Sequence, residues 1–179
     1  MVRHGVSFDT IVGSGPNSSI IHSEPSDRVI EQGDVVQLDF GCILDGFCSD
    51  CSRVLFMGNV DEEFKKIYDI VYEAHKFAID NAKAGMKASE IDALARNIVK
   101  LSGYDFNHAV GHAVGKEVHE KPVISPKDET IIENGMVITI EPAIYIEGKF
   151  GIRIEDTCLM KDCELVSLNN TTKEIRIIE

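Results

Sequence analysis

Residues 38–50 read LDFGCILDGFCSD, which is the pattern of a β-hairpin that turns at its centre. Apolar residues dominate both arms, and Asp45-Gly46 between them is a strong signal for a two-residue turn, because both central residues of such a turn need φ > 0. With this turn, Asp39 on one arm faces Ser52 on the other. The fold is therefore expected to contain an antiparallel pair with this register.

Two acidic residues of this hairpin, Asp39 and Asp50, are predicted to point to the same face, because side chains alternate along a strand. As diagonal neighbours they lie about 7–8 Å apart at Cβ, or somewhat less. Two carboxylates in an otherwise apolar hairpin repel each other and resist joint ionisation unless a cation lies between them. The hairpin therefore predicts a cation site.

Composition limits the class of protein. The chain has 179 residues, 44% of them hydrophobic, as expected for one domain with a hydrophobic core. Its net charge of −12 argues against nucleic acid and anionic membranes as partners. No apolar run has the length of a membrane span, and residues 1–5 lack the apolar region of a signal peptide, so a cytoplasmic protein is expected.

The five cysteines argue against a disulfide framework, because their number is odd and the chain is of ordinary size. Cys48 and Cys51 match a C-x-x-C spacing. In a strand, however, positions i and i+3 point to opposite faces. We therefore expect both to be core or half-exposed thiols, with no zinc or redox role.

Outside the hairpin the chain alternates short strands with two helices. A strand is expected over residues 7–12, a helix over residues 61–82 with Asp61 as its N-cap, and a second helix that starts with Ser89 as N-cap and ends at Gly103. His75 on the first helix is expected to be a packed or surface histidine and not a ligand.

A second acidic hairpin is predicted near the C-terminus. Residues 136–146 and 152–160 have strand patterns around a loop centred on Gly148, which places Glu141 opposite Glu155. Pro142 breaks the first of these strands, because proline cannot donate to the ladder, and it indicates a bulge or an edge.

Between the helices and this second hairpin lies a compact histidine cluster, which contains His108, His112 and His119 among small residues. Small residues permit a close backbone approach, which both a binding site and a tightly packed connection require. The segment alone does not decide between these two interpretations.

Four carboxylates and one or more histidines suit two divalent cations held about 3.5–4 Å apart. A donor set rich in oxygen favours Mn²⁺, Co²⁺ or Fe²⁺ as well as Zn²⁺. Such a pair lowers the pKa of a bridging water and polarises a carbonyl group, which is the chemistry of amide hydrolysis. Arg153, on the face of Glu155, is placed to orient a carboxylate from behind.

Six motifs spread over most of the chain carry a resemblance: SFDTIVGSGPNS, PSDRVIEQGDVVQLDFG, DGFCSD, GHAVGKEVHE, NGMVITIEPAIYI and GIRIED. Together they resemble the pita-bread metallopeptidases, which include Xaa-Pro dipeptidase (prolidase), aminopeptidase P and methionine aminopeptidase. The first two motifs are closer to the prolidase and aminopeptidase P branch. The resemblance implies an α+β fold, a curved antiparallel sheet with helices on its outer face, in a single, partial catalytic domain over residues 1–179.

The resemblance also implies roles for individual residues. Asp50 and Glu155 correspond to ligands that bridge two metal ions, and Glu141 to a ligand that also assists the nucleophilic water. The five residues that match the metal ligands are Asp39, Asp50, His112, Glu141 and Glu155. The residues that match histidines for substrate binding or proton handling, which stabilise the tetrahedral intermediate, are His22, His108 and His119.

The chain departs from the family pattern in two ways. Ala109 and Ala113 stand where the family usually has glycine. The family also has a helical segment and a strand before residue 7, and its Xaa-Pro enzymes usually have an N-terminal domain, so we expect an N-terminally truncated form. An incomplete fold exposes apolar surface, and a homodimer is expected for that reason.

The leading hypothesis is hydrolysis of the Xaa-Pro bond in dipeptides or short peptides by a metal-bridging water or hydroxide. It requires two divalent ions, preferably Mn²⁺ or Co²⁺, with Zn²⁺ or Fe²⁺ as alternatives, and a proline-containing di- or oligopeptide as substrate. The alternatives are a catalytically silent binding module or inactive fragment, an enzyme like methionine aminopeptidase, and a creatinase-like hydrolase without metal.

Overall fold

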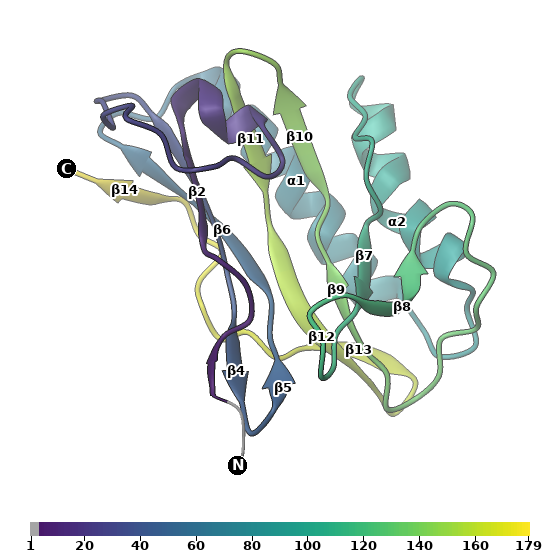
Figure 1. Cartoon of the computed structure of the whole chain (residues 1–179). Coiled ribbons are helices and arrows are strands. Elements are labelled where there is room, and N and C mark those ends of the chain that lie inside the picture. Colours follow the sequence, from purple (N-terminus) through teal and green to yellow (C-terminus); the bar gives the residue numbers. More distant parts are fainter. Residues whose placement is uncertain (1–3) are drawn as a thin grey trace.

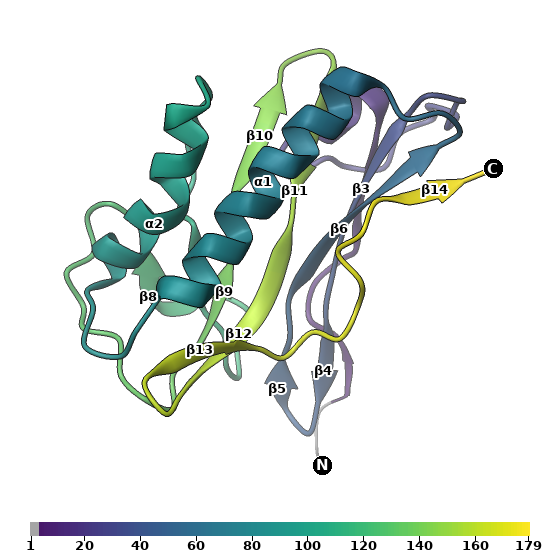
Figure 2. The same cartoon turned by 180° about the vertical axis from the view of Figure 1, so that it is seen from behind.

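A computed structural model describes residues 4–179 of the chain. Figures 1 and 2 show two helices, α1 (Glu62–Asn81) and α2 (Ala88–Leu101), packed on one face of a curved sheet. The strands before them are β1 (Gly5–Val6), β2 (Ile11–Ser14), β3 (Val35–Phe40), β4 (Cys42–Leu44), β5 (Phe47–Cys48) and β6 (Cys51–Met57). Those after them are β7 (Gly111–Ala113), β8 (Glu120–Ile124), β9 (Val137–Ile140), β10 (Ala143–Ile146), β11 (Phe150–Arg153), β12 (Glu155–Lys161), β13 (Glu164–Ser167) and β14 (Arg176–Ile178).

The main sheet has the strand order β2-β3-β6-β12-β9-β7-β8. Strand β13 pairs with β12, and β14 at the C-terminus pairs with β6 in parallel. Two smaller sheets, β1-β4-β5 and β10-β11, extend the two long hairpins beyond it. A short 3-10 helix, η1 (Gly15–Ser19), follows β2 and contacts β11.

The register predicted for the first hairpin is confirmed. Asp39 pairs with Ser52, and both turn residues have positive φ, 53° at Asp45 and 85° at Gly46. The hairpin bends at Gly41, where it passes from the main sheet to the small one. A side chain at Gly41 would collide with the carbonyl oxygen of Ser49, so glycine is required for the two arms to approach at the bend.

The register of the second hairpin is also confirmed. Ala143 pairs with Arg153 in the outer part of the hairpin, and Thr139 pairs with Thr157 in the inner part, so the same register holds on both sides of Pro142. The interruption that Pro142 predicts is present, because β9 ends before it and β10 starts after it.

The strand predicted over residues 7–12 is wrong in part. The chain forms β1 in the small sheet, makes no strand over residues 7–10, and first enters the main sheet as β2. The Ser7 hydroxyl explains the break, since it donates to the carbonyls of Cys42 at 2.8 Å and Ser49 at 2.9 Å and ties this segment to the hairpin bend. The periodicity of apolar residues cannot predict a side-chain contact of this kind.

Both predicted helices are present. Asp61 caps α1 by accepting from the Glu63 N–H at 2.7 Å, as predicted. The N-cap of α2 is Lys87 and not Ser89, because the Glu90 carboxylate accepts from the Lys87 N–H at 2.8 Å and closes the first turn earlier. The Ser89 hydroxyl donates instead to Glu129.

The hydrophobic core lies between the helices and the sheet. The helices contribute Phe64, Ile67, Tyr68 and Ile91 to this core, and the sheet contributes isoleucines of β9 and residues of β12. His75 is packed in this core, as predicted, and is 1% exposed. All five cysteines are unpaired thiols. Within residues 4–179, neither helix has the length and apolarity that crossing a bilayer requires.

A buried group of charges sits beside this core. The Asp156 carboxylate accepts from Arg53 Nη2, Lys173 Nζ and Ser167 Oγ at 2.7, 2.7 and 2.6 Å, and His75 Nε2 lies 3.7 Å away. The Asp156 side chain has no exposed surface. The group joins β6 and β12 to the part of the chain after β13, residues 168–179, which we call the C-terminal segment. This group of charges lies on the helix side of the sheet.

Candidate metal centre

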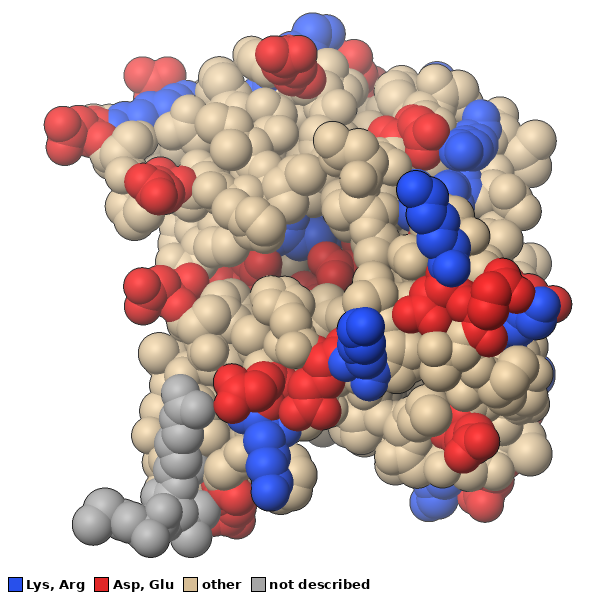
Figure 3. Space-filling view, turned by 45° about the vertical axis from the view of Figure 1, so that its right-hand side comes forward, with Lys and Arg blue, Asp and Glu red and all other residues tan. Residues whose placement is uncertain are grey.

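A cavity of about 630 Å³ opens on the other side of the sheet from α1. Neighbouring residues of β12 divide between the two sides, because Asp156 points toward His75 of α1 and Glu155 points into the cavity. Figure 3 shows the corresponding hollow, with acidic and basic atoms on its floor. All nine residues singled out from the sequence line this cavity: His22, Asp39, Asp50, His108, His112, His119, Glu141, Arg153 and Glu155.

Three overlapping groups of side chains are close enough to share an ion. In each group the ligand atoms all lie within 4.8 Å of one another. The groups are Asp39, Asp50 and Glu155; His112, Glu141 and Glu155; and Asp50, His112 and His119. The two hairpins supply the carboxylates, and the segment from β7 to β8 supplies the histidines.

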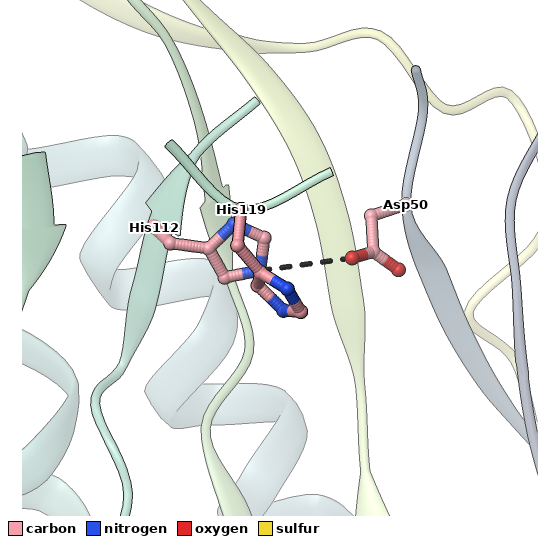
Figure 4. A group of neighbouring side chains, drawn as sticks. All are labelled: Asp50, His112 and His119. Carbon is pink, nitrogen blue, oxygen red and sulfur yellow. Dashed lines mark ion pairs between the residues drawn. The ribbon is translucent and has the colours of Figure 1, made fainter. Parts of the chain in front are cut away.

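His119, which the resemblance assigns to substrate binding or proton handling, lies beside the predicted metal ligands. Its ring centroid is 4.4 Å from that of His112, and Figure 4 shows both rings next to Asp50. His112 Nε2 is 3.6 Å from an oxygen of Asp50 and 3.6 Å from one of Glu141. The structure thus places His119 at the border between the acidic cluster and the open cavity.

The carboxylates of this cluster are short of positive charge. Burial raises the pKa of Asp50 to about 8, and the carboxylates of Asp39 and Glu141 add to the rise. Burial likewise raises the pKa of Glu141 to about 7, and burial followed by repulsion from Glu141 raises that of Glu155 well above its usual range. One oxygen each of Asp39 and Asp50 is buried with no hydrogen-bond partner among the described residues. Unpartnered, crowded oxygens of this kind fit divalent cations.

Two histidines of the cavity, His108 and His112, are held neutral. Burial lowers the pKa of both His108 and His112 to about 4. His112 Nδ1 lies 3.1 Å from the carbonyl oxygen of Ala113, and since a carbonyl only accepts, Nδ1 carries the proton. Its Nε2 lone pair then faces the carboxylates, as a metal-binding imidazole requires.

Arg153 is the cation at the back of the cluster. Its guanidinium donates to Asp39 Oδ2 at 2.6 Å, to the Tyr145 hydroxyl at 2.7 Å and to Ser52 Oγ at 2.9 Å. Ser52 Oγ in turn donates to Glu155 Oε2 at 2.8 Å. The predicted place of Arg153 behind a carboxylate agrees with this geometry, although its direct partner is Asp39.

Sequence reasoning missed three polar residues that hold the cluster. Tyr145 lies between Arg153 and His108, whose Nε2 is 3.4 Å from the tyrosine oxygen. Ser52 links Arg153 to Glu155, and the Thr139 hydroxyl accepts from the His112 N–H at 3.0 Å. Ser52 was detectable, because the hairpin register already places it opposite Asp39. Tyr145 and Thr139 carry no comparable signal.

The raised carboxyl pKa values predict how the stability of the metal-free chain depends on pH. An acid with a raised pKa holds its proton longer in the folded state, so ionisation costs folding free energy as pH rises toward the folded pKa. The buried neutral histidines act in the opposite direction, but only up to about pH 6.5, where the unfolded imidazole also becomes neutral. The melting temperature in EDTA is therefore expected to fall between about pH 6.5 and 8.

Thermal melts in EDTA across this range check the prediction. The Asp50→Asn variant is the matched control, because it removes one of the groups that ionise and should give a shallower decline. A wild-type melting temperature that stays level or rises from pH 6.5 to 8 in EDTA would contradict the raised pKa values of Asp50 and Glu141.

Comparisons with known proteins give a consistent result. The model of metallopeptidase family M24 matches residues 3–162. An Xaa-Pro dipeptidase of Pyrococcus horikoshii is 47% identical over 170 residues, which are 94% of this chain and 48% of the relative. The chain therefore spans about half the length of the curated relatives it matches.

Solved structures agree with the sequence relatives. A prolidase from Thermococcus sibiricus superposes with a TM-score of 0.95 at 45% identity, over 97% of this chain and 48% of that one. An X-Pro aminopeptidase from Thermotoga maritima gives 0.94 at 41% identity, over 97% and 50%. The α+β pita-bread fold predicted from the motifs, with its curved antiparallel sheet and helices on the outer face, is confirmed.

Proposed function

The chain belongs to metallopeptidase family M24, and from this we propose that it forms the two-metal centre of a peptidase that cleaves the bond before proline in dipeptides or short peptides. One observation carries the proposal. Four carboxylates and His112 meet in one cavity, and buried oxygens of Asp39 and Asp50 there have no hydrogen-bond partner among the described residues.

Asp39, Asp50, His112, Glu141 and Glu155 would hold two divalent cations. Asp50 and Glu155 are the best candidates for bridging ligands, because each belongs to two of the three groups and a carboxylate has two oxygens to offer. His112 also belongs to two groups, but its single free lone pair serves one ion. The oxygen-rich donor set supports Mn²⁺ or Co²⁺, with Zn²⁺ or Fe²⁺ as alternatives.

When bound, the two cations would activate a water molecule and polarise the scissile carbonyl. The chain's own residues would do the rest. Glu141 lies in the same cavity, with an oxygen 3.6 Å from His112 Nε2, and would accept a proton from the attacking water. Arg153 holds Asp39 in place. His22, His108 and His119 line the cavity and would orient the peptide, and His22 and His119 would donate hydrogen bonds to the developing oxyanion.

Metal content and turnover test this function together. The purified chain is expected to bind about two Mn²⁺ or Co²⁺ ions and then to hydrolyse an Xaa-Pro dipeptide, but not the matching Xaa-Ala dipeptide. Bound metal without turnover of any peptide would instead support the silent binding module. Absence of bound metal would contradict the two-metal centre itself.

A substrate series separates the related activities. The relatives include both Xaa-Pro dipeptidases and an X-Pro aminopeptidase. Cleavage of dipeptides but not of longer Xaa-Pro peptides would support a dipeptidase, and the reverse would support an aminopeptidase. Release of methionine from peptides without proline would support the alternative that resembles methionine aminopeptidase.

A further inference from the structure

The main sheet divides next to the candidate metal centre. Strands β6 and β12 pair at Ser52–Glu155 and at Cys51–Asp156. The next pair in this register would join Asp50 to Thr157 through their main chains. However, the main-chain N–H and carbonyl of Thr157 form hydrogen bonds with other residues.

The main-chain N–H and carbonyl of Thr157 form hydrogen bonds with the C-terminal segment and not with Asp50. The Thr157 N–H donates to Asn169 Oδ1 at 2.7 Å, and the Leu168 N–H donates to the Thr157 carbonyl at 2.9 Å. This segment follows β13, which pairs with β12, and Figure 2 shows it running from β13 toward β14 past β6. It therefore separates β12 from the chain at Asp50, and the sheet forks at Thr157.

The Thr157 hydroxyl bridges this fork. It accepts from the Asp50 N–H at 3.0 Å and donates to the Asp50 carbonyl at 2.8 Å, so one side chain serves both main-chain polar groups of Asp50. The two residues are 4% and 5% exposed. A cavity of about 440 Å³ lined by Ser49, Thr157 and Asn169 lies at the fork, so loss of the hydroxyl leaves room for the main chain of Asp50 to shift.

We propose that Thr157 is a positioning residue that fixes the main chain of Asp50, and that Asn169 orients Thr157 in turn. The need for such a device follows from the cluster itself, because the Asp50 carboxylate is crowded by those of Asp39 and Glu155 and would move away from them if its backbone were free. The inference rests on the proposed function in one respect, namely that the Asp50 carboxylate is a metal ligand.

Thr157→Val tests the proposal, because valine keeps the shape of threonine and lacks the hydroxyl. Titration calorimetry with Mn²⁺ is expected to show affinity lowered about 10- to 100-fold, the loss usual for a residue that orients a metal ligand. The Co²⁺ absorption spectrum should change with it, since the geometry at Asp50 changes. Thr157→Ser, which keeps the hydroxyl, should bind Mn²⁺ nearly as wild type does.

Thr171→Val is the matched control. It makes the same replacement in the C-terminal segment, where the hydroxyl contacts Cys51 Sγ at 4.0 Å and no atom of Asp50. Melting curves in EDTA confirm which variants are folded. If Thr157→Val does not fold, Asn169→Ala decides, because it removes the bond from the Thr157 N–H to Asn169 and is expected to weaken Mn²⁺ binding, whereas wild-type affinity in this variant would overturn the proposal.

The outcomes are distinguishable. Wild-type affinity in folded Thr157→Val, or an equal loss in Thr157→Ser, would overturn the role of Thr157 and leave the proposed function intact. No Mn²⁺ binding by the wild-type chain would overturn the proposed function and this inference together. Amide hydrogen exchange of Asp50 in EDTA adds a readout without metal, and it should be faster in Thr157→Val than in wild type.

Discussion

Asp50→Ala is expected to abolish binding of divalent cations at both positions of the proposed centre. The Asp50 carboxylate belongs to two of the three candidate ligand groups, so under the proposed function its loss would remove an oxygen ligand from both ions. After dialysis against Mn²⁺, the measured metal content should fall from about two ions per chain in wild type to a background level in the variant. Hydrolysis of an Xaa-Pro dipeptide should fall with it.

The same variant should remain folded. Asp50 is one of several carboxylates that repel one another in the metal-free chain, and burial with this repulsion raises its pKa to about 8. Alanine removes that repulsion, so the melting temperature in EDTA at pH 8 should equal or exceed that of wild type. This separates loss of metal from loss of fold.

Asp45→Asn is the control for Asp50→Ala. Asp45 lies in the turn of the same hairpin with φ of 53°, a conformation that asparagine tolerates well, and its side chain is 75% exposed. This variant should bind metal as wild type does. Retention of two ions by Asp50→Ala would show that the assignment of Asp50 as a bridging ligand is wrong.

Asp156→Asn is expected to have the largest effect on stability, a loss of about 3–5 kcal/mol in the free energy of unfolding. The fully buried Asp156 carboxylate accepts from Arg53, Lys173 and Ser167. Asparagine keeps the shape but removes the negative charge, which leaves Arg53 buried with no counter-charge from Asp156. The C-terminal segment should lose one of its attachments to the sheet at the same time, the ion pair between Lys173 and Asp156.

Urea denaturation in EDTA measures this effect without any contribution from metal binding. The control is Asp80→Asn, because Asp80 pairs with Lys76 on the exposed face of α1. Exposed pairs contribute little, so that variant should unfold nearly as wild type does. Equal midpoints for the two variants would show that the buried group around Asp156 does not anchor the segment.

The two hairpins, the helices and the place of the acidic residues follow from the amino-acid sequence alone. The Asp45-Gly46 turn sets a register that the structure keeps along the whole first hairpin, because a two-residue turn leaves the arms one way to pair. The loop at Gly148 does the same for Glu141 and Glu155. These signals are local, so they can be read without the fold.

The groups that surround those acids are set by the packing of segments that are distant in the sequence. The contact of Ser7 with the hairpin bend, the position of Tyr145 beside His108 and the bridge from Thr157 to Asp50 join residues from 35 to 107 positions apart. None of them follows from periodicity or turn chemistry, because a single hydroxyl carries each contact and its partner is set by how the sheets curve and fork. The sequence shows where charge must be balanced, and packing of distant segments decides which side chains hold it in place.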